Sequence, residues 1–63
     1  MTSDDFYNTV HKSIEEEHDA GSLYVELGKN AINECDRKML MKMARQEIQH
    51  KANLEWIYLR KDM

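Results

Sequence analysis

The sequence predicts an all-α fold, in which an antiparallel two-helix hairpin dimerises into a four-helix bundle. The chain has no proline and only two glycines, and 33% of its residues are charged, which favours helix and leaves little turn chemistry for a sheet. Apolar residues recur at spacings of three and four along two stretches that flank a short break. A break this short forces the two helices to run antiparallel, so we expect a single domain over residues 1–63.

The first predicted helix covers about residues 3–31. Thr2 or Ser3 can cap its N-terminus, and Asp4 and Asp5 are well placed against the positive end of the helix dipole. One stripe of this helix consists of Phe6, Val10, Ile14, Glu17, Gly21, Tyr24, Gly28 and Ala31. The stripe expected to face inward therefore contains a glutamate.

The second predicted helix covers about residues 34–61, after a turn at about residues 32–33. Asn33 is a suitable N-cap, and Asp36 three positions later resembles the partner residue of a capping box. The inward stripe consists of Leu40, Met43, Glu47, His50, Leu54 and Ile57. Here too, acidic and imidazole side chains occupy an otherwise apolar stripe.

The small size of the chain requires an additional source of stability. At 63 residues and 7.5 kDa, a hydrophobic core alone seldom suffices without disulfides, a metal or oligomerisation. Cys35 is the only cysteine, so a disulfide within one chain is excluded. We interpret it as a reduced bystander, with an intermolecular disulfide as the alternative, and we expect a metal, a partner or both.

Composition also excludes some classes of function. A net charge of -3 and a pI of about 5.5 argue against a nucleic-acid-binding protein, which would carry a clustered basic patch. No apolar stretch approaches the roughly 20 residues that span a bilayer, and the acidic N-terminus does not resemble a signal peptide. We therefore expect a cytoplasmic location without membrane contact.

Three polar residues on the inward stripes, Glu17, Glu47 and His50, indicate a metal site. A carboxylate on a buried helix face costs several kcal/mol unless it is paired, hydrogen-bonded or bound to metal. Glu47 and His50 are three residues apart and share one helix face. With the turn near Asn33, all three residues lie roughly 21 to 26 Å from it at ~1.5 Å per residue, so we expect them at one level of the hairpin.

One hairpin offers too few ligands to enclose two metal ions. Two copies related by a two-fold axis would supply four glutamates and two histidines. This is the ligand set of di-iron and di-manganese carboxylate bundles, in which two helices give a Glu and two give a Glu-x-x-His. The sequence thus predicts a homodimer with the metal site at its interface.

The motifs Glu17-x6-Tyr24 and Glu47-x2-His50 resemble those of a known group of proteins. Over roughly residues 14–60 the chain resembles half of a rubrerythrin-type, ferritin-like bundle, and it is also similar to encapsulated ferritin-like proteins. The resemblance implies two irons between paired hairpins and oxidation of Fe(II) by oxygen or peroxide, with manganese or zinc as possible substitutes. It also implies that Glu17 and Glu47 are carboxylate ligands, that His50 is an imidazole ligand and that Tyr24 donates a hydrogen bond to the site.

The same resemblance implies an iron entry route past Glu16 and Asp19. Rubrerythrins carry a four-cysteine iron domain that delivers electrons, whereas this chain has one cysteine, so we expect a ferroxidase-like activity rather than a complete peroxidase cycle. Encapsulated ferritins carry a shell-targeting tail, whereas this sequence ends at Met63, so packaging in a shell is not expected. Assembly of dimers into rings stays open.

Several alternatives remain at this point. The chain could be a metal-binding or storage module without turnover, or a structural hairpin that binds a partner and pairs Glu17 with His50. Tyr24 could be an ordinary core tyrosine. His11, Glu15 and His18 have the spacing for a second metal on an outer helix face, although surface histidines are common.

Overall fold

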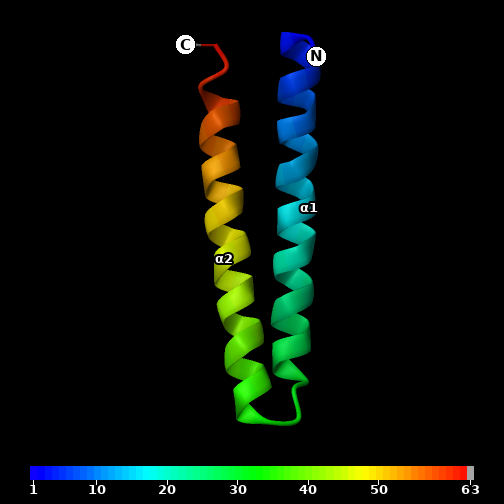
Figure 1. Cartoon of the computed structure of the whole chain (residues 1–63), viewed down its shortest axis with the longest axis vertical. Helices are drawn as coiled ribbons and strands as arrows, with labels where there is room; N and C mark the ends of the chain where they lie inside the picture. Colours follow the sequence, from blue (N-terminus) through cyan, green and yellow to red (C-terminus); the bar gives the residue numbers. More distant parts are fainter. Residues whose placement is uncertain (63) are drawn as a thin grey trace.

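The chain folds into two helices that pack against each other. The computed structural model describes residues 1–62 and contains α1 (Ser3–Lys29) and α2 (Glu34–Leu59), with no strand in that range (Figure 1). The predicted all-α fold and two-helix packing are confirmed. Residue 63, the last residue of the expected domain, lies outside the described residues.

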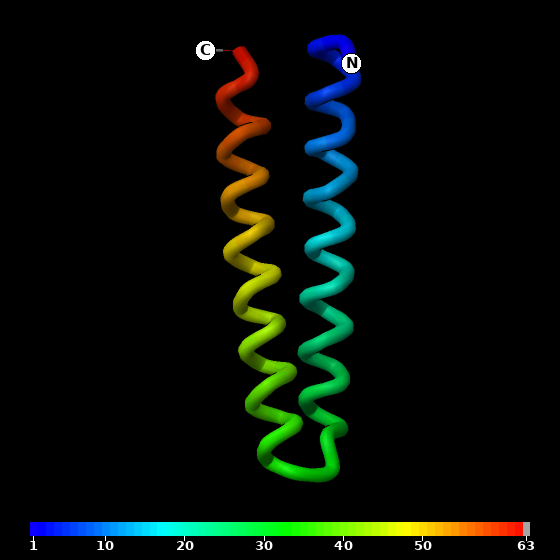
Figure 2. The backbone as a smooth tube through the Cα atoms, viewed as in Figure 1, coloured from blue at the N-terminus to red at the C-terminus, as the bar shows by residue number. Residues whose placement is uncertain are grey.

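The hairpin is a long, thin rod. Its Cα atoms extend over 46 × 16 × 13 Å. The helices run antiparallel, with the short turn at one end and both termini at the other (Figure 2). Each helix therefore packs one face against the other helix, and the rest of its surface is not covered by another helix.

The N-terminus of α1 is held by a reciprocal pair of hydrogen bonds. The Asp5 N–H donates to Thr2 Oγ1 at 3.1 Å, and the Thr2 N–H donates to Asp5 Oδ2 at 3.3 Å. Thr2, one of the two predicted caps, is therefore the N-cap. The helix ends at Lys29, two residues before the expected end; the Ala31 N–H donates to the Gly28 carbonyl at 3.3 Å, and the Asn30 side chain donates to the Glu26 carbonyl at 2.9 Å.

Helix α2 begins at a cap that Asn33 and Asp36 build together. The Asp36 N–H donates to Asn33 Oδ1 at 2.8 Å, as expected of an N-cap. The Asp36 carboxylate accepts from the Asn33 side-chain amide at 3.1 Å instead of reaching back to the cap's backbone. The helix ends at Leu59, also two residues before its predicted end.

The contact between the helices is narrow and close, and we call it the seam, defined by its buried residues Val10, Gly21, Gly28 and Ala44. A Cβ atom placed on Gly21 would lie 3.5 Å from the Glu47 Cβ, and one on Gly28 would lie 2.9 Å from the Met41 Cε. The absence of a side chain at Gly28 thus lets Met41 lie against the backbone of α1.

Few apolar side chains are buried in the described residues. Only Val10 and Ala44 count as buried apolar residues, while Phe6 of the predicted inward stripe is exposed. The large apolar residues that remain exposed are Met1, Phe6, Leu23, Leu27, Ile32, Met39, Ile48, Trp56 and Leu59. Between residues 1 and 62, neither helix has both the length and the apolar character needed to cross a membrane.

The capping contact of Asn33 leads to a stability prediction. Replacing Asn33 by Ala removes the acceptor of the Asp36 N–H, so Asn33→Ala should lower the free energy of unfolding by about 1 kcal/mol. Urea unfolding followed by far-UV circular dichroism measures this. Asn8→Ala, at an exposed position inside α1, is the matched control and should leave stability unchanged or slightly higher, because Ala favours helix. Equal effects of the two substitutions would show that the cap is not formed.

Candidate metal centre

The structure brings Glu17, Glu47 and His50 together at the seam, and we call these three residues the ligand group. Each offers a ligand atom, and the three atoms lie within 4.8 Å of one another. His50 Nδ1 lies 3.5 Å from Glu17 Oε2 and 3.9 Å from Glu47 Oε2. Their expected placement at one level of the hairpin agrees with this geometry.

Local sequence explains how the two helices hold the ligand group. Glu47 and His50 lie three residues apart on α2, so their side chains point from the same side of that helix. Gly21 follows Glu17 by about one helical turn and contacts Glu47, because no side chain separates the two helices there. The close approach at Gly21 thus carries the α2 ligands toward the α1 ligand.

Burial differs among the three side chains. The Glu17 and Glu47 side chains are 28% and 19% exposed, whereas that of His50 is 57% exposed. Oε2 of Glu17 is fully buried and has no hydrogen-bond partner. A buried acceptor without a partner costs about 1–3 kcal/mol, and more when it is charged. The Nδ1 of His50 lies 3.5 Å from this oxygen, and a bound cation would supply the closer partner that it lacks.

The chemistry of the donor atoms fits a transition metal. Two carboxylates and a neutral imidazole carry two negative charges, and oxygen and imidazole ligands together suit iron, manganese or zinc. Three ligands leave coordination positions open on the side where His50 is exposed. A centre held by one hairpin would therefore be incomplete.

The other predicted site residues are not part of the ligand group. Tyr24 is half-buried about two turns along α1 from Glu17, and no hydrogen bond among residues 1–62 links the two. His11 lies 3.8 Å from Glu15, but the Nδ1 atom of His18 faces the Lys51 Nζ at 3.3 Å. The described residues thus contain no second group of three metal-binding side chains. Cys35 is exposed near the start of α2.

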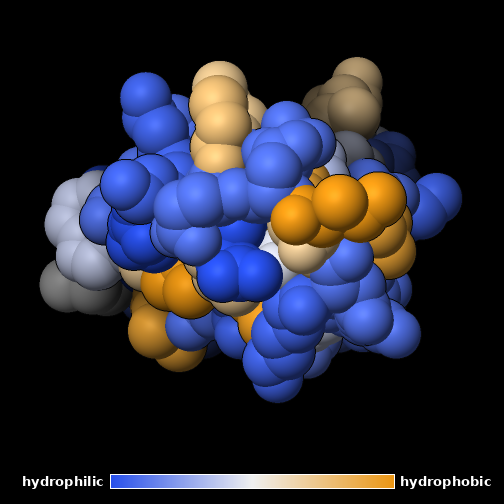
Figure 3. All heavy atoms as spheres, turned by 90° about the horizontal axis from the view of Figure 1, so that it is seen from below, coloured by the Kyte–Doolittle hydropathy of each residue, from blue (hydrophilic) through white to orange (hydrophobic). Residues whose placement is uncertain are grey.

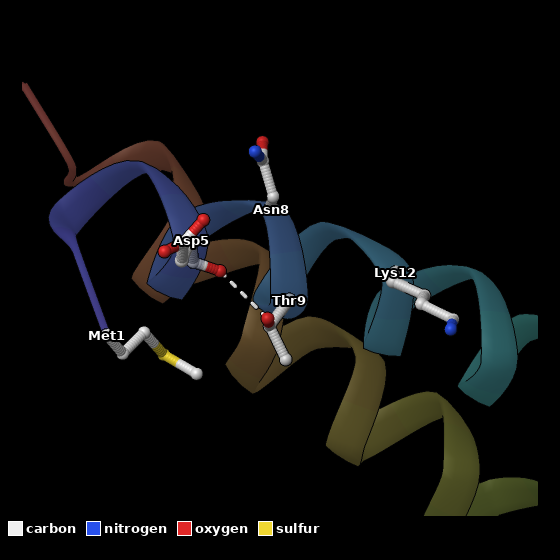
Figure 4. A pocket seen from close by; sticks show the side chains of 5 residues that line it. All are labelled: Met1, Asp5, Asn8, Thr9 and Lys12. Carbon is white, nitrogen blue, oxygen red and sulfur yellow. Dashed lines mark hydrogen bonds between the residues drawn. The ribbon is translucent and has the colours of Figure 1, made fainter.

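A shallow hollow elsewhere on the surface has no connection with this centre. It is lined by Met1, Asp5, Asn8, Thr9 and Lys12. Figure 4 shows these side chains around the first turns of α1, where the Thr9 hydroxyl donates to the Asp5 carbonyl at 2.8 Å. The hollow contains no residue of the ligand group and is open, so we assign no chemistry to it.

The contact between Lys51 and His18 was not predicted from the sequence. Periodicity placed Glu17 and His50 on inward stripes, and Lys51 carries a charge that such patterns assign to solvent. The signal that could have found it is the register of the hairpin. Once Glu17 faces His50, the next residues, His18 and Lys51, are offset by only about 3 Å along the antiparallel helices, a distance that a lysine side chain spans.

Comparisons of this chain with protein-family models, with curated proteins and with solved structures found no match. The resemblance to ferritin-like families therefore stays a prediction that rests on the motifs of the chain itself.

The geometry predicts that loss of Glu17 abolishes tight metal binding. Because outer hydrogen-bond partners of metal ligands already contribute 10- to 100-fold, Glu17→Gln should weaken Fe(II) binding about 100-fold or more. Anaerobic titration with Fe(II), followed by calorimetry, measures the affinity. Glu26→Gln removes the same charge from an exposed position of α1 and should change the affinity less than about twofold. Equal affinities of the two variants would exclude Glu17 as a ligand.

Proposed function

We propose that this chain is a di-iron carboxylate protein. In this proposal, two copies form a four-helix bundle that binds two irons between them and oxidises Fe(II) with oxygen or peroxide, in iron storage or protection against oxidative stress. The observation that carries the proposal is the ligand group itself, with three ligand atoms within 4.8 Å and a buried Glu17 oxygen that has no hydrogen-bond partner.

Surface area supports the pairing of two copies. The chain exposes 5031 Å², whereas a folded monomer of 7.5 kDa is expected to expose about 4,200 Å². The excess of roughly 800 Å² is about what one partner buries in a protein interface of standard size. A second copy of the hairpin is thus a suitable partner by size.

Exposed apolar side chains also support pairing. Leu23 and Leu27 of α1 and Met39 of α2 remain roughly half-exposed, and Ile32 in the turn is fully exposed. Figure 3, which looks along the hairpin from the turn end, shows apolar side chains at the surface between hydrophilic ones. Burial of such residues at about 25 cal/mol per Å² is the main source of free energy for association.

A second copy would complete the metal centre. It would double the ligand group to four carboxylates and two imidazoles, the set that di-iron bundles use. The carboxylates would favour Fe(III) over Fe(II), because anionic ligands stabilise the higher charge. When bound, each Fe(II) would supply one electron to the oxidant. The chain's own residues would hold the irons and leave positions open for oxygen or peroxide.

Other parts of the proposal rest on the sequence alone. Tyr24 would donate a hydrogen bond at the centre in the assembled dimer, and Glu16 and Asp19, both exposed, would line the route by which Fe(II) enters. A cytoplasmic location and further assembly into rings stay predictions.

A second candidate function has one observation in its favour. The 3.5 Å contact between His50 and Glu17 is an ion pair when the imidazole is protonated, and such a pair would compensate for part of the cost of the carboxylate without metal. The chain would then be a structural hairpin that binds a partner. This alternative expects no rise in thermal stability with iron and a dimer that survives a chelator. A metal-binding module without turnover would bind iron or zinc but consume no oxygen.

The proposal predicts rapid Fe(II) oxidation by the assembled protein. Metal-free protein mixed with Fe(II) in air should oxidise it faster than buffer does and bind about two irons per dimer. Glu47→Ala removes a ligand and should reduce the rate to that of buffer, whereas Glu26→Ala, the matched control, should retain it. Absorbance of Fe(III) and oxygen uptake report the reaction. A wild-type rate no higher than that of buffer would refute ferroxidase function.

A further inference from the structure

We propose that Lys51 and His18 are positioning residues for the metal centre, because their contact fixes the register and rotation of α2 against α1 at the level of the ligand group. We call this contact the clasp. The Lys51 Nζ lies 3.3 Å from His18 Nδ1. This inference rests on the proposed metal centre, whose three ligand side chains the clasp would keep in position.

Polar contacts between the two helices are rare in this hairpin. Of the side-chain hydrogen bonds and ion pairs among residues 1–62, only two join α1 to α2, namely His50 with Glu17 and Lys51 with His18. All the others join residues at most four positions apart, within a helix, at a cap or after the end of α2. Both contacts between helices are formed by consecutive residues, so both lie at one level.

The two contacts lie on opposite sides of the seam. Consecutive residues of a helix point about 100° apart, so Glu17 and His18 diverge from the line of contact, as do His50 and Lys51. A groove along one side of the seam is lined by residues that include His18, Gly21 and Lys51, but not Glu17 or His50. The seam is thus joined on both sides at the level of the ligand group.

Attachment on both sides restrains motions that the apolar core leaves free. Among residues 1–62, Val10 and Ala44 are the only buried apolar side chains, so few interlocking groups prevent α2 from rolling or sliding along α1. A slide by one helical turn is about 5.4 Å, which exceeds the 4.8 Å span of the ligand group. The clasp opposes such motions on the side that His50 does not reach.

The chemistry of the clasp assigns the roles of donor and acceptor. A lysine ammonium can only donate, so His18 Nδ1 must accept and the ring proton of a neutral His18 must lie on Nε2. Glu55 Oε1 lies 3.8 Å from the same ammonium and holds it from within α2. The Lys51 side chain is 34% exposed, so the clasp is a weak restraint that acts through geometry more than through energy.

Anaerobic Fe(II) titration of matched variants tests the clasp. Lys51→Met keeps the length of the side chain and removes its donor, and it should weaken Fe(II) binding roughly three- to tenfold, less than outer partners that touch a ligand directly. Lys42→Met removes the same charge at an exposed position of α2 and should change the affinity less than about twofold. Lys51→Arg retains a donor and should preserve most of the affinity.

The sign of the effect separates the clasp from simple electrostatics. Removing a positive charge near a cation site strengthens cation binding by electrostatics, so weaker binding in Lys51→Met has the opposite sign and indicates lost positioning. In a His18→Ala background, Lys51→Met should have no further effect, because the contact is already absent.

Each outcome supports or overturns the inference. The inference is supported if Fe(II) binds more weakly to Lys51→Met and to His18→Ala than to the wild type, and no more weakly to the double variant than to either single variant. Wild-type binding of Fe(II) with equal affinities of Lys51→Met and Lys42→Met overturns the clasp and leaves the metal centre intact. No Fe(II) binding by the wild-type protein overturns the metal centre itself, and the role of the clasp with it.

Discussion

The close approach of the two helices at Gly21 is the constraint on which the rest of this structure depends. A hairpin has a single seam, and every side chain at that seam is partly buried by the facing helix. Here Gly21 of α1 lies beside Glu47 of α2, so that a Cβ placed on Gly21 would be in van der Waals contact with the Glu47 Cβ at 3.5 Å. At this level of the seam, two carboxylates and an imidazole therefore lie where apolar side chains would be expected to pack.

This arrangement has a cost that a cation would offset. A buried oxygen of Glu17 without a hydrogen bond reduces the stability of a hairpin in which only two apolar side chains among residues 1–62 are buried. Metal bound to the ligand group would provide a partner for this oxygen, and binding free energy would then contribute to folding and assembly. Stability, pairing and metal binding are therefore linked in this account, and each of them depends on the same short stretch of the seam.

The sequence was sufficient to predict the features that periodicity and capping determine. The two helices and the common depth of Glu17, Glu47 and His50 follow from spacing, because 3.6 residues per turn fixes both face and height. Capping chemistry predicted Asn33 as one cap and left Thr2 or Ser3 as the other. The helix ends were each predicted two residues too late; at the end of α1 the Ala31 N–H donates to the Gly28 carbonyl in a tighter turn, and the Asn30 side chain adds a hydrogen bond to the Glu26 carbonyl. Spacing does not reveal such local competition.

Contacts between the helices were less accessible to prediction. Lys51 has a charge that is normally solvated, and its approach to His18 depends on the rotation of each helix about its axis, which a hydrophobic stripe defines only within a broad sector. The packing of Met41 against Gly28 was missed for the same reason, because predicting it requires knowledge of how closely the backbones pack. A stripe predicts the face of a helix, and packing determines which residues at its edges meet.

Diffraction from crystals grown with Fe(II) tests the central claim most directly, because it locates the metal and the second copy together. Anomalous scattering at the iron edge should show two iron positions between two copies of the hairpin, each within about 2.0–2.2 Å of Glu17, Glu47 or His50 atoms, in the range of oxygen and imidazole ligands. Two hairpins that meet through another face, or iron absent from the ligand group, would contradict the account.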